Sequence, residues 1–303
     1  MEEVFQVIII DVNQSIWQER SSSSSHNENE NENCSSLFEE VIKSLLVYCN
    51  IHSSLSKDNS LSILIYNQQT TQVIFPSNES IRRLGDRAYI PSSSASISSS
   101  ISSSISSSSL SISSSSSSLS FSEEITQKLL ECCQPSEERI CQGNLTRSLS
   151  QALCIINRRL QVNPKVLAKI LIVHVSPDIS HTYNQMMNCI FSAQKLGIPV
   201  DSAVLSSHNS SFLQQASFLT NGVYQRFKDQ STLLQQLIYH VLPSGKYRNE
   251  LKSPLQKSVD FKASCSCHGQ QTEFTYMCSV CLSLYCTRPE THCETCGTLI
   301  RQK

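Results

Sequence analysis

The stretch Val4-Phe5-Gln6-Val7-Ile8-Ile9-Ile10-Asp11-Val12-Asn13 decides the fold of this chain. Residues 4–10 form an apolar run that ends at an aspartate, as a buried strand does where its carboxyl end opens onto a loop. A second run of this kind covers residues 170–175 and is followed by Ser176-Pro177-Asp178. These two runs predict the central strands of one sheet.

Strands and helices alternate around these two runs. We expect further strands at residues 61–66, 71–75, 200–205 and 223–227, and helices at residues 37–49, 145–160, 183–196, 211–219 and 232–242. This alternation predicts an α/β fold in which helices cover both faces of a doubly wound, mostly parallel sheet. Residues 67–69 join two short strands as a hairpin, which adds one antiparallel edge strand.

The composition divides the chain into two predicted domains. Residues 21–33 and 91–120 are serine-rich or polar and cannot bury enough apolar area to order themselves, so we expect disordered insertions there. The α/β domain is predicted at residues 1–245, a polar linker at 246–260 and a small cysteine-rich module at 261–303.

Charge and hydropathy limit the classes of function. The net charge of −1 gives no overall basic field, and only Arg288, Arg301 and Lys303 lie near the cysteines, so there is no strong signal for direct nucleic-acid binding. The chain has no run of 18 apolar residues, so we expect no membrane span. The first strand lacks the basic flank of a signal peptide, so we expect an intracellular protein.

Half of the 14 cysteines crowd into the C-terminal module. The other seven are scattered, mostly in apolar stretches, and are predicted to pack as buried thiols. The crowded set predicts Zn²⁺ binding, because a C-x-x-C pair lets two thiolates face one ion and a tetrahedral site needs two such pairs. The predicted metal ligands are Cys265, Cys267, Cys278, Cys281, Cys286, Cys293 and Cys296.

The spacing leaves two ways of sharing these ligands. In a sequential arrangement Cys265 and Cys267 share one ion with the Cys278–Cys281 pair. In a cross-braced arrangement the Cys278–Cys281 pair instead joins Cys293 and Cys296. A second site would then use Cys265, Cys267 or His268, and Cys286.

Polar residues at predicted strand ends suggest a second kind of site. Ligands bind beyond the carboxyl ends of strands in doubly wound sheets, and Asp11, Asn13, Ser15, Thr146 and Asp178 all lie in such loops. Together they resemble the metal-ion-dependent adhesion site of von Willebrand A domains, which binds Mg²⁺ through hard oxygen ligands. Asn13 stands where that site has a serine, so the alternative is that Asp11 and Asn13 only stabilise a turn.

Catalytic arrangements are missing from the sequence pattern. The chain has seven glycines and no glycine-rich phosphate loop after a strand. His174 lies inside an apolar strand, where we expect a satisfied buried histidine rather than a catalyst. The sequence therefore predicts no enzyme.

The order of features resembles a known family. The opening strand with Asp11-Val12-Asn13, the box Tyr276-Met-Cys278-Ser-Val-Cys281-Leu-Ser-Leu-Tyr-Cys286 and the closing Cys293-Glu-Thr-Cys296 are similar to those of the smaller von Willebrand A and zinc-finger subunit of the general transcription and repair factor TFIIH. The stretches 188–195, 213–216 and 259–265 support this resemblance, which spans nearly the whole chain outside the insertions.

The resemblance implies a von Willebrand A-like domain and a non-catalytic subunit of the TFIIH core. Such a subunit acts in the nucleus, in RNA polymerase II transcription initiation and nucleotide excision repair. Its chief partner is the larger von Willebrand A subunit, which carries a RING-type zinc domain. The family has a four-cysteine finger, which favours the sequential set of Cys265, Cys267, Cys278 and Cys281 as ligands. The family's magnesium site is degenerate, which is consistent with Asn13 in place of the usual serine.

Two other functions remain as alternatives. One is an adhesion-type module that grips a partner carboxylate through Mg²⁺ at Asp11, Asn13 and Ser15. The other is a RING-like ubiquitin ligase module, although Thr287, Arg288 and Pro289 follow Cys286 where a complete RING needs a further cysteine.

Overall fold

The structure, a computed structural model, describes residues 3–18, 33–67, 70–76, 125, 144–179, 182–206, 209–227, 230–251, 259–268, 270–289 and 291–300. The predicted insertions therefore lie outside the described residues, except for Asn33 at the start of a helix. Within the described ranges, no helix combines the length and hydrophobicity that crossing a membrane requires.

A six-stranded sheet forms the centre of the first domain, with strand order β3-β2-β1-β4-β5-β6. The strands are β1 (Val4–Asp11), β2 (Ser60–Tyr66), β3 (Thr71–Phe75), β4 (Leu167–His174), β5 (Val200–Val204) and β6 (Tyr224–Arg226). All neighbouring pairs are parallel except β2 and β3. This sheet confirms the predicted α/β class, with a doubly wound, mostly parallel sheet and one antiparallel edge strand.

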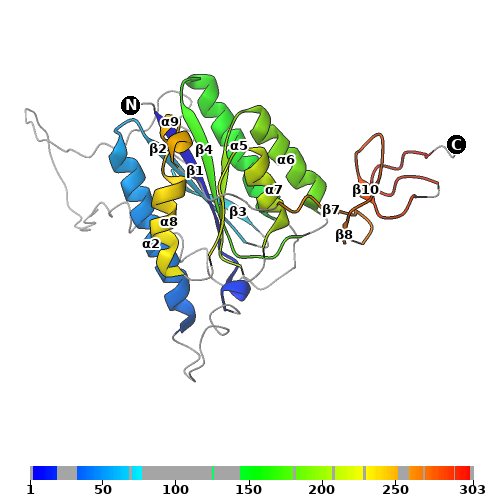
Figure 1. Ribbon diagram of the computed structural model, residues 1–303, viewed down its shortest axis with the longest axis horizontal. Coiled ribbons are helices and arrows are strands. Elements are labelled where there is room, and N and C mark those ends of the chain that lie inside the picture. The colour runs from blue at the N-terminus through cyan, green and yellow to red at the C-terminus, as the bar shows by residue number, and fades with distance from the viewer. Residues whose placement is uncertain are drawn as a thin grey trace, which may run out of the picture.

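Helices cover both faces of the sheet (Figure 1). The helices are α2 (Asn33–Leu55), α5 (Asn144–Val162), α6 (Tyr183–Lys195), α7 (Ser211–Leu219), α8 (Leu233–Gln236), the π-helical turn η3 (Leu237–Val241) and α9 (Lys246–Glu250). The α2 and α8 helices pack on one face, and α5, α6 and α7 on the other.

The β1 strand explains why both faces are covered. Successive side chains of a strand point to opposite faces. Ile8 and Ile10 accordingly belong to the core beneath α2 and α8, whereas Val7 and Ile9 belong to the core beneath α5, α6 and α7. Alternate side chains of one apolar strand therefore pack into the two cores on opposite faces of the sheet, as the sequence predicts for a strand covered on both faces.

The structure differs from the prediction at residues 246–250, which we expected to be linker. They form α9, and the Arg248 guanidinium pairs with the fully buried carboxylate of Asp201 on β5. The ammonium of Lys169 on β4 donates to the carbonyl oxygens of Val241 and Leu242, just before α9. The Arg248–Asp201 pair therefore holds α9 against the sheet, and Lys169 holds the chain shortly before it, which local polarity alone could not reveal.

The C-terminal module lies beyond α7 (Figure 1). It is built from two short antiparallel hairpins, which pair β7 (Ala263–Ser264) with β8 (Gln271–Thr272) and β9 (Tyr276–Met277) with β10 (Leu284–Tyr285). Its first residues contact α7, because the backbone of Asp260 bonds to the side chains of Gln214 and Gln215. The Phe261 ring also lies edge-on to Phe218, with ring centroids 5.3 Å apart.

Candidate metal centres

The parallel strands bring the predicted strand-end residues together. Asp11, Asn13, Thr146 and Asp178 line one pocket of about 120 Å³ at the carboxyl edge of the sheet. Ser15 bonds to one of them, since its hydroxyl donates to Oδ1 of Asn13 at 3.1 Å. The sequence pattern therefore located a real concavity with two carboxylates in its lining.

The Asp11 carboxylate is fully buried and already surrounded by donors. Its Oδ2 accepts from the backbone N–H of Ser176 at 2.9 Å and of Val175 at 3.2 Å, and lies 3.3 Å from Nδ1 of His174. Its Oδ1 accepts from the N–H of Asn13 at 3.1 Å. Burial opposes ionisation, but the bonds and charge of His174 and the bonds from Ser176 outweigh it and lower the pKa of Asp11.

The Asp178 carboxylate accepts hydrogen bonds from residues at the start of α7. Its Oδ1 accepts from the Ser210 hydroxyl at 2.5 Å, and its Oδ2 from the Ser211 hydroxyl and the Phe212 N–H, each at 3.2 Å. A carboxylate there satisfies free helix N–H groups and the positive end of the helix dipole. Both carboxylates thus join loops and helices across the sheet edge, and assignment of Mg²⁺ to Asp11, Asn13, Ser15, Thr146 and Asp178 stays a prediction.

His174 is buried, as predicted, but only one side of its ring has a partner. Nδ1 lies 2.6 Å from the Tyr66 hydroxyl and next to Asp11. Nε2 has no hydrogen-bond partner among the described residues. The histidine therefore belongs to a buried polar group with Asp11 and Tyr66, which strand hydropathy did not predict.

The cysteines of the module gather into two clusters. The four-cysteine cluster contains Cys278, Cys281, Cys293 and Cys296, and the mixed cluster contains Cys265, Cys267, His268 and Cys286. Within each cluster the possible ligand atoms all lie within 4.8 Å of one another. In the described part of the chain, these are the groups of three or more such side chains that could hold a metal ion.

Two tight turns build the four-cysteine cluster. The first lies between β9 and β10, where the N–H of Leu282 bonds to the carbonyl of Cys278 at 3.0 Å. In the second, the N–H of Gly297 bonds to the carbonyl of Cys293 at 2.7 Å, and Gly297 has a φ of 71°. A residue with a side chain is strained at this φ, so glycine suits the turn that follows the last cysteine pair.

The sulfur spacing of the four-cysteine cluster fits a tetrahedral ion. Sγ of Cys278 lies 3.8 Å from Sγ of Cys296, and Sγ of Cys281 lies 3.5 Å from Sγ of Cys293. Bonds of about 2.3 Å to one tetrahedral zinc ion place two sulfurs about 3.8 Å apart. The four thiols therefore have the arrangement that metal binding requires.

The Cys293 thiol of the four-cysteine cluster has a lowered pKa. Burial of Cys293 opposes the charge, but the Tyr285 hydroxyl and the backbone N–H groups of Cys296 and Thr295 lower its pKa to about 6. The Tyr285 oxygen lies 3.1 Å from this sulfur. Because the thiolate is the form that binds metal, this environment favours coordination near neutral pH.

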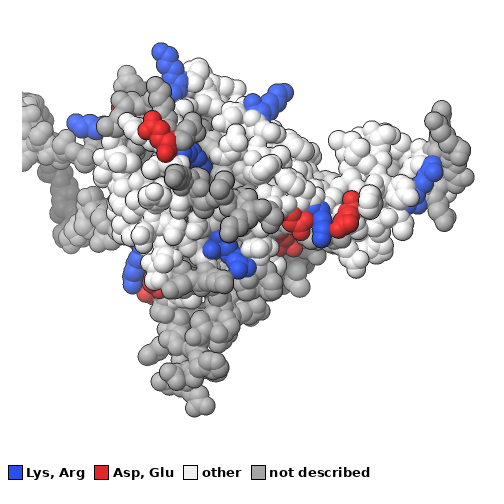
Figure 2. Space-filling view, viewed as in Figure 1, with Lys and Arg blue, Asp and Glu red and all other residues white. Residues whose placement is uncertain are grey.

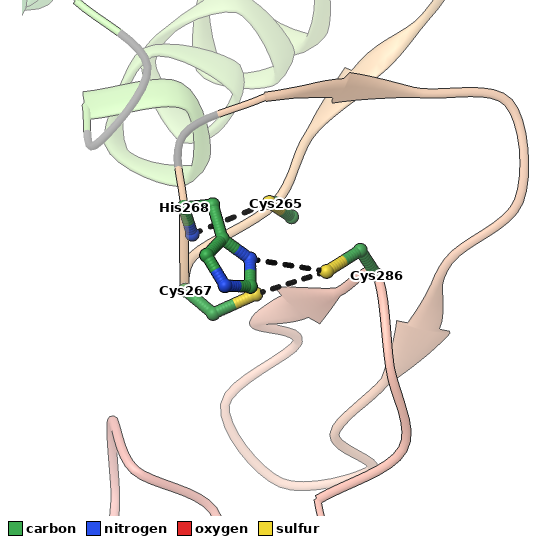
Figure 3. Close-up of side chains that lie close together, drawn as sticks. All are labelled: Cys265, Cys267, His268 and Cys286. Carbon is green, nitrogen blue, oxygen red and sulfur yellow. Dashed lines mark hydrogen bonds between the residues drawn. The ribbon is translucent and has the colours of Figure 1, made fainter.

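The mixed cluster joins the end of β7 to the end of β10 (Figure 3). Sγ of Cys286 lies 3.3 Å from Sγ of Cys267 and 3.3 Å from Nδ1 of His268. The backbone N–H of His268 points at Sγ of Cys265 from 3.4 Å. Burial opposes ionisation of Cys265, but bonds from the N–H groups of His268 and Gln270 help to lower its pKa to about 6.

The two clusters interleave along the sequence, so the sequential set of Cys265, Cys267, Cys278 and Cys281 is wrong for this structure. The β9–β10 hairpin gives the physical reason. It carries Cys278 and Cys281 in its turn and Cys286 after its last strand, at the opposite end. The structure thus has the cross-braced arrangement, with His268 beside Cys267 in the mixed cluster.

Comparisons with known proteins agree with this architecture. A family model described as "Transcription factor Tfb4" matches residues 4–297. Over 159 residues the chain is 46% identical to general transcription factor IIH subunit 3 of Dictyostelium discoideum, covering 52% of the chain and 42% of that relative. Over 172 residues it is 40% identical to general transcription and DNA repair factor IIH subunit TFB4 of Arabidopsis thaliana, covering 55% and 56%.

The matches to these two curated relatives span about half of their length. Among solved structures, the crystal structure of the TFIIH p34 N-terminal domain matches with a TM-score of 0.54 at 20% identity. That match covers 78% of this chain and 97% of the other, and it shows a shared fold.

Proposed function

The chain belongs to the transcription factor Tfb4 family, and we propose on this basis that it is a non-catalytic structural subunit of the TFIIH core complex. It acts in the nucleus, in RNA polymerase II transcription initiation and nucleotide excision repair, through contacts with other subunits. The observation that carries this proposal is the family match over residues 4–297, which confirms the resemblance recognised in the sequence.

The strand-end pocket supports a role without catalysis. The carboxylates of Asp11 and Asp178 hold backbone and hydroxyl groups of neighbouring loops. Both groups fix the ends of β1, β4 and α7, which suits a rigid scaffold.

Zinc is the metal we assign to the four-cysteine cluster. Four thiolates in tetrahedral geometry are typical of structural zinc sites, which keep no open position for a substrate. The module is small, and its own core consists of Tyr285 with four of the cysteines. Metal binding therefore supplies much of the free energy that folds it.

The surface of the module supports protein contacts. Among its described residues, the exposed large apolar side chains are Phe261, Phe274, Tyr276, Met277, Val280, Leu282 and Leu299. Phe274 is 87% exposed, which is unusual for a large aromatic side chain unless a partner covers it. On the face shown in Figure 2, the described lysine and arginine side chains are scattered rather than gathered in a basic stripe. We therefore propose a protein partner, chiefly the larger von Willebrand A and RING subunit of TFIIH.

The interleaved clusters favour one alternative, a RING-like ubiquitin ligase module. RING modules hold two metal ions with alternating ligand pairs. Here Cys265, Cys267 and Cys286 supply three possible ligands of the mixed cluster, and His268 supplies the fourth. This alternative expects binding of a ubiquitin-conjugating enzyme loaded with ubiquitin. The adhesion-type alternative instead expects a contact that needs Mg²⁺.

Reconstitution with the larger von Willebrand A subunit tests the proposal. The two full-length chains are co-expressed and purified through a tag on one of them, in EDTA at a concentration that strips Mg²⁺ and spares zinc. We expect a stable complex under these conditions. Release by EDTA would support the adhesion module, and capture of a loaded conjugating enzyme without the larger subunit would support the ligase.

A further inference from the structure

A second group of metal-binding side chains lies outside the four-cysteine cluster. Cys265 is buried, Cys267 and Cys286 are half-buried, and the His268 ring is exposed with Nδ1 turned toward Cys286 (Figure 3). Three elements meet here, namely the end of β7, the turn after it and the residue after β10. The sequence separates His268 from Cys286 by 18 positions, so the hairpin fold alone brings them together.

The distances fit one tetrahedral ion with three sulfur ligands and one nitrogen ligand. Zinc–sulfur bonds of about 2.3 Å and a zinc–nitrogen bond of about 2.0 Å place sulfur and nitrogen ligands about 3.5 Å apart. Nδ1 of His268 lies 3.3 Å from Sγ of Cys286, which is close to that value. Sγ of Cys267 lies 3.3 Å from Sγ of Cys286, so an ion between these two sulfurs would move them apart toward about 3.8 Å. The possible ligand atoms of all four residues also lie within 4.8 Å of one another, as one shared ion requires.

We propose that Cys265, Cys267, His268 and Cys286 bind a second Zn²⁺ ion through three thiolates and Nδ1 of His268. This site shares no ligand with the four-cysteine cluster. The Cys265 to His268 turn forms one half of the site, because the His268 N–H points at the Cys265 sulfur as in zinc-binding turns. Cys286 forms the other half.

The second ion fixes how the module begins. Just before Cys265, Asp260 bonds to Gln214 and Gln215 of α7, so this stretch leads directly from the α/β domain into the site. Next to Cys265, the N–H of Ser266 donates to the carbonyl of Leu284 at 2.6 Å and places the first turn on β10. An ion at this site therefore joins the segment bound to α7 to the β9–β10 hairpin, whereas the four-cysteine cluster joins that hairpin to the last turn.

Native mass spectrometry of the reduced, full chain with Zn²⁺ tests the proposal. We expect two ions in the wild type and in His292→Ala, because His292 is an exposed histidine of the module outside both clusters. His268→Ala should keep one ion and bind the second more than about 100-fold more weakly, since even a hydrogen-bond partner of a ligand is worth about tenfold to 100-fold in affinity. Chelator competition measures this ratio.

His268→Cys keeps the test informative if His268→Ala disturbs the fold. This variant should regain the second ion, and its Co²⁺-substituted form should show the absorption of two all-sulfur sites instead of one all-sulfur and one mixed site. A single ion in the reduced wild type, with Cys267 and Cys286 left as free thiols, would overturn the proposal. So would equal affinity for the second ion in wild type and His268→Ala.

Discussion

Sγ of Cys281 and Sγ of Cys293 lie 3.5 Å apart although the two cysteines are 12 positions apart in the sequence. Cys286 stands between them and belongs to the other cluster. The chain therefore passes from one candidate metal site to the other and back. This path makes each site depend on the β9–β10 hairpin that both of them share.

Metal removal should unfold the C-terminal module and leave the α/β domain intact. Trp17 reports on the domain, because it is the only tryptophan of the chain and lies buried in the core beneath α2. A strong zinc chelator should leave Trp17 emission unchanged while hydrogen exchange becomes fast across residues 263–300. A shift of Trp17 emission with the chelator would show that the domain needs the metal, contrary to this account.

Asp11→Ala should destabilise the α/β domain by about 3 kcal/mol, because it leaves the N–H groups of Val175 and Ser176 without their acceptor in a buried position. Urea unfolding followed by Trp17 emission measures the change. Asp58→Ala is the matched control, since Asp58 is exposed. Stabilisation of the wild type by millimolar Mg²⁺, lost in Asp11→Ala, would instead support the predicted magnesium site.

His52 should make the α/β domain less stable at mildly acidic pH. Burial lowers the pKa of this histidine to about 3 in the folded chain, whereas the unfolded value is 6.5. Between these values the unfolded chain binds the extra proton, so stability is lost as the pH falls below 6.5. From pH 7 to pH 5 the loss is about 2 kcal/mol from this residue.

His52→Leu should therefore flatten the pH dependence of urea unfolding between pH 7 and pH 5. The exposed His292 provides the control, because His292→Leu should leave that dependence unchanged. An equally steep loss of stability in His52→Leu would show that other groups cause it.

The Arg248–Asp201 pair should hold α9 on the sheet. Arg248→Met leaves the buried Asp201 carboxylate without its counter-charge and should cost about 3–5 kcal/mol. The double variant Arg248→Met with Asp201→Asn should be less destabilised than Arg248→Met alone, because no unpaired buried charge remains. Arg147→Met, at an exposed position of α5, serves as control in the same unfolding experiment. Additive costs in the double variant would refute the coupling.

Hydrophobic periodicity was enough to predict the sheet and most of its helices. The run at Val4–Asp11 carries residues for two cores, so a single strand already implied helices on both faces. Strand ends followed by polar residues also located the pocket that Asp11 and Asp178 share. These features depend on local pattern, which the sequence displays directly.

The remaining features depend on contacts between distant segments. The C-x-x-C spacing fits both the sequential and the cross-braced arrangement of ligands. Only the register of the β9–β10 hairpin places Cys286 away from Cys278 and Cys281. Likewise, the sequence around Arg248 gives no sign of its pairing with Asp201, which lies 47 positions away. The residues of α9 were therefore predicted to be part of a polar linker. The adjacency of His268 to Cys267 was the one local signal for the fourth ligand of the mixed cluster.

Affinity purification of the tagged, full-length chain from nuclear extract, followed by mass spectrometry, tests the central claim most directly. The account predicts that the recovered proteins include the TFIIH core subunits, with the larger von Willebrand A subunit in a constant ratio to the tagged chain. Purification that yields the folded, metal-bound chain without any TFIIH subunit would contradict it.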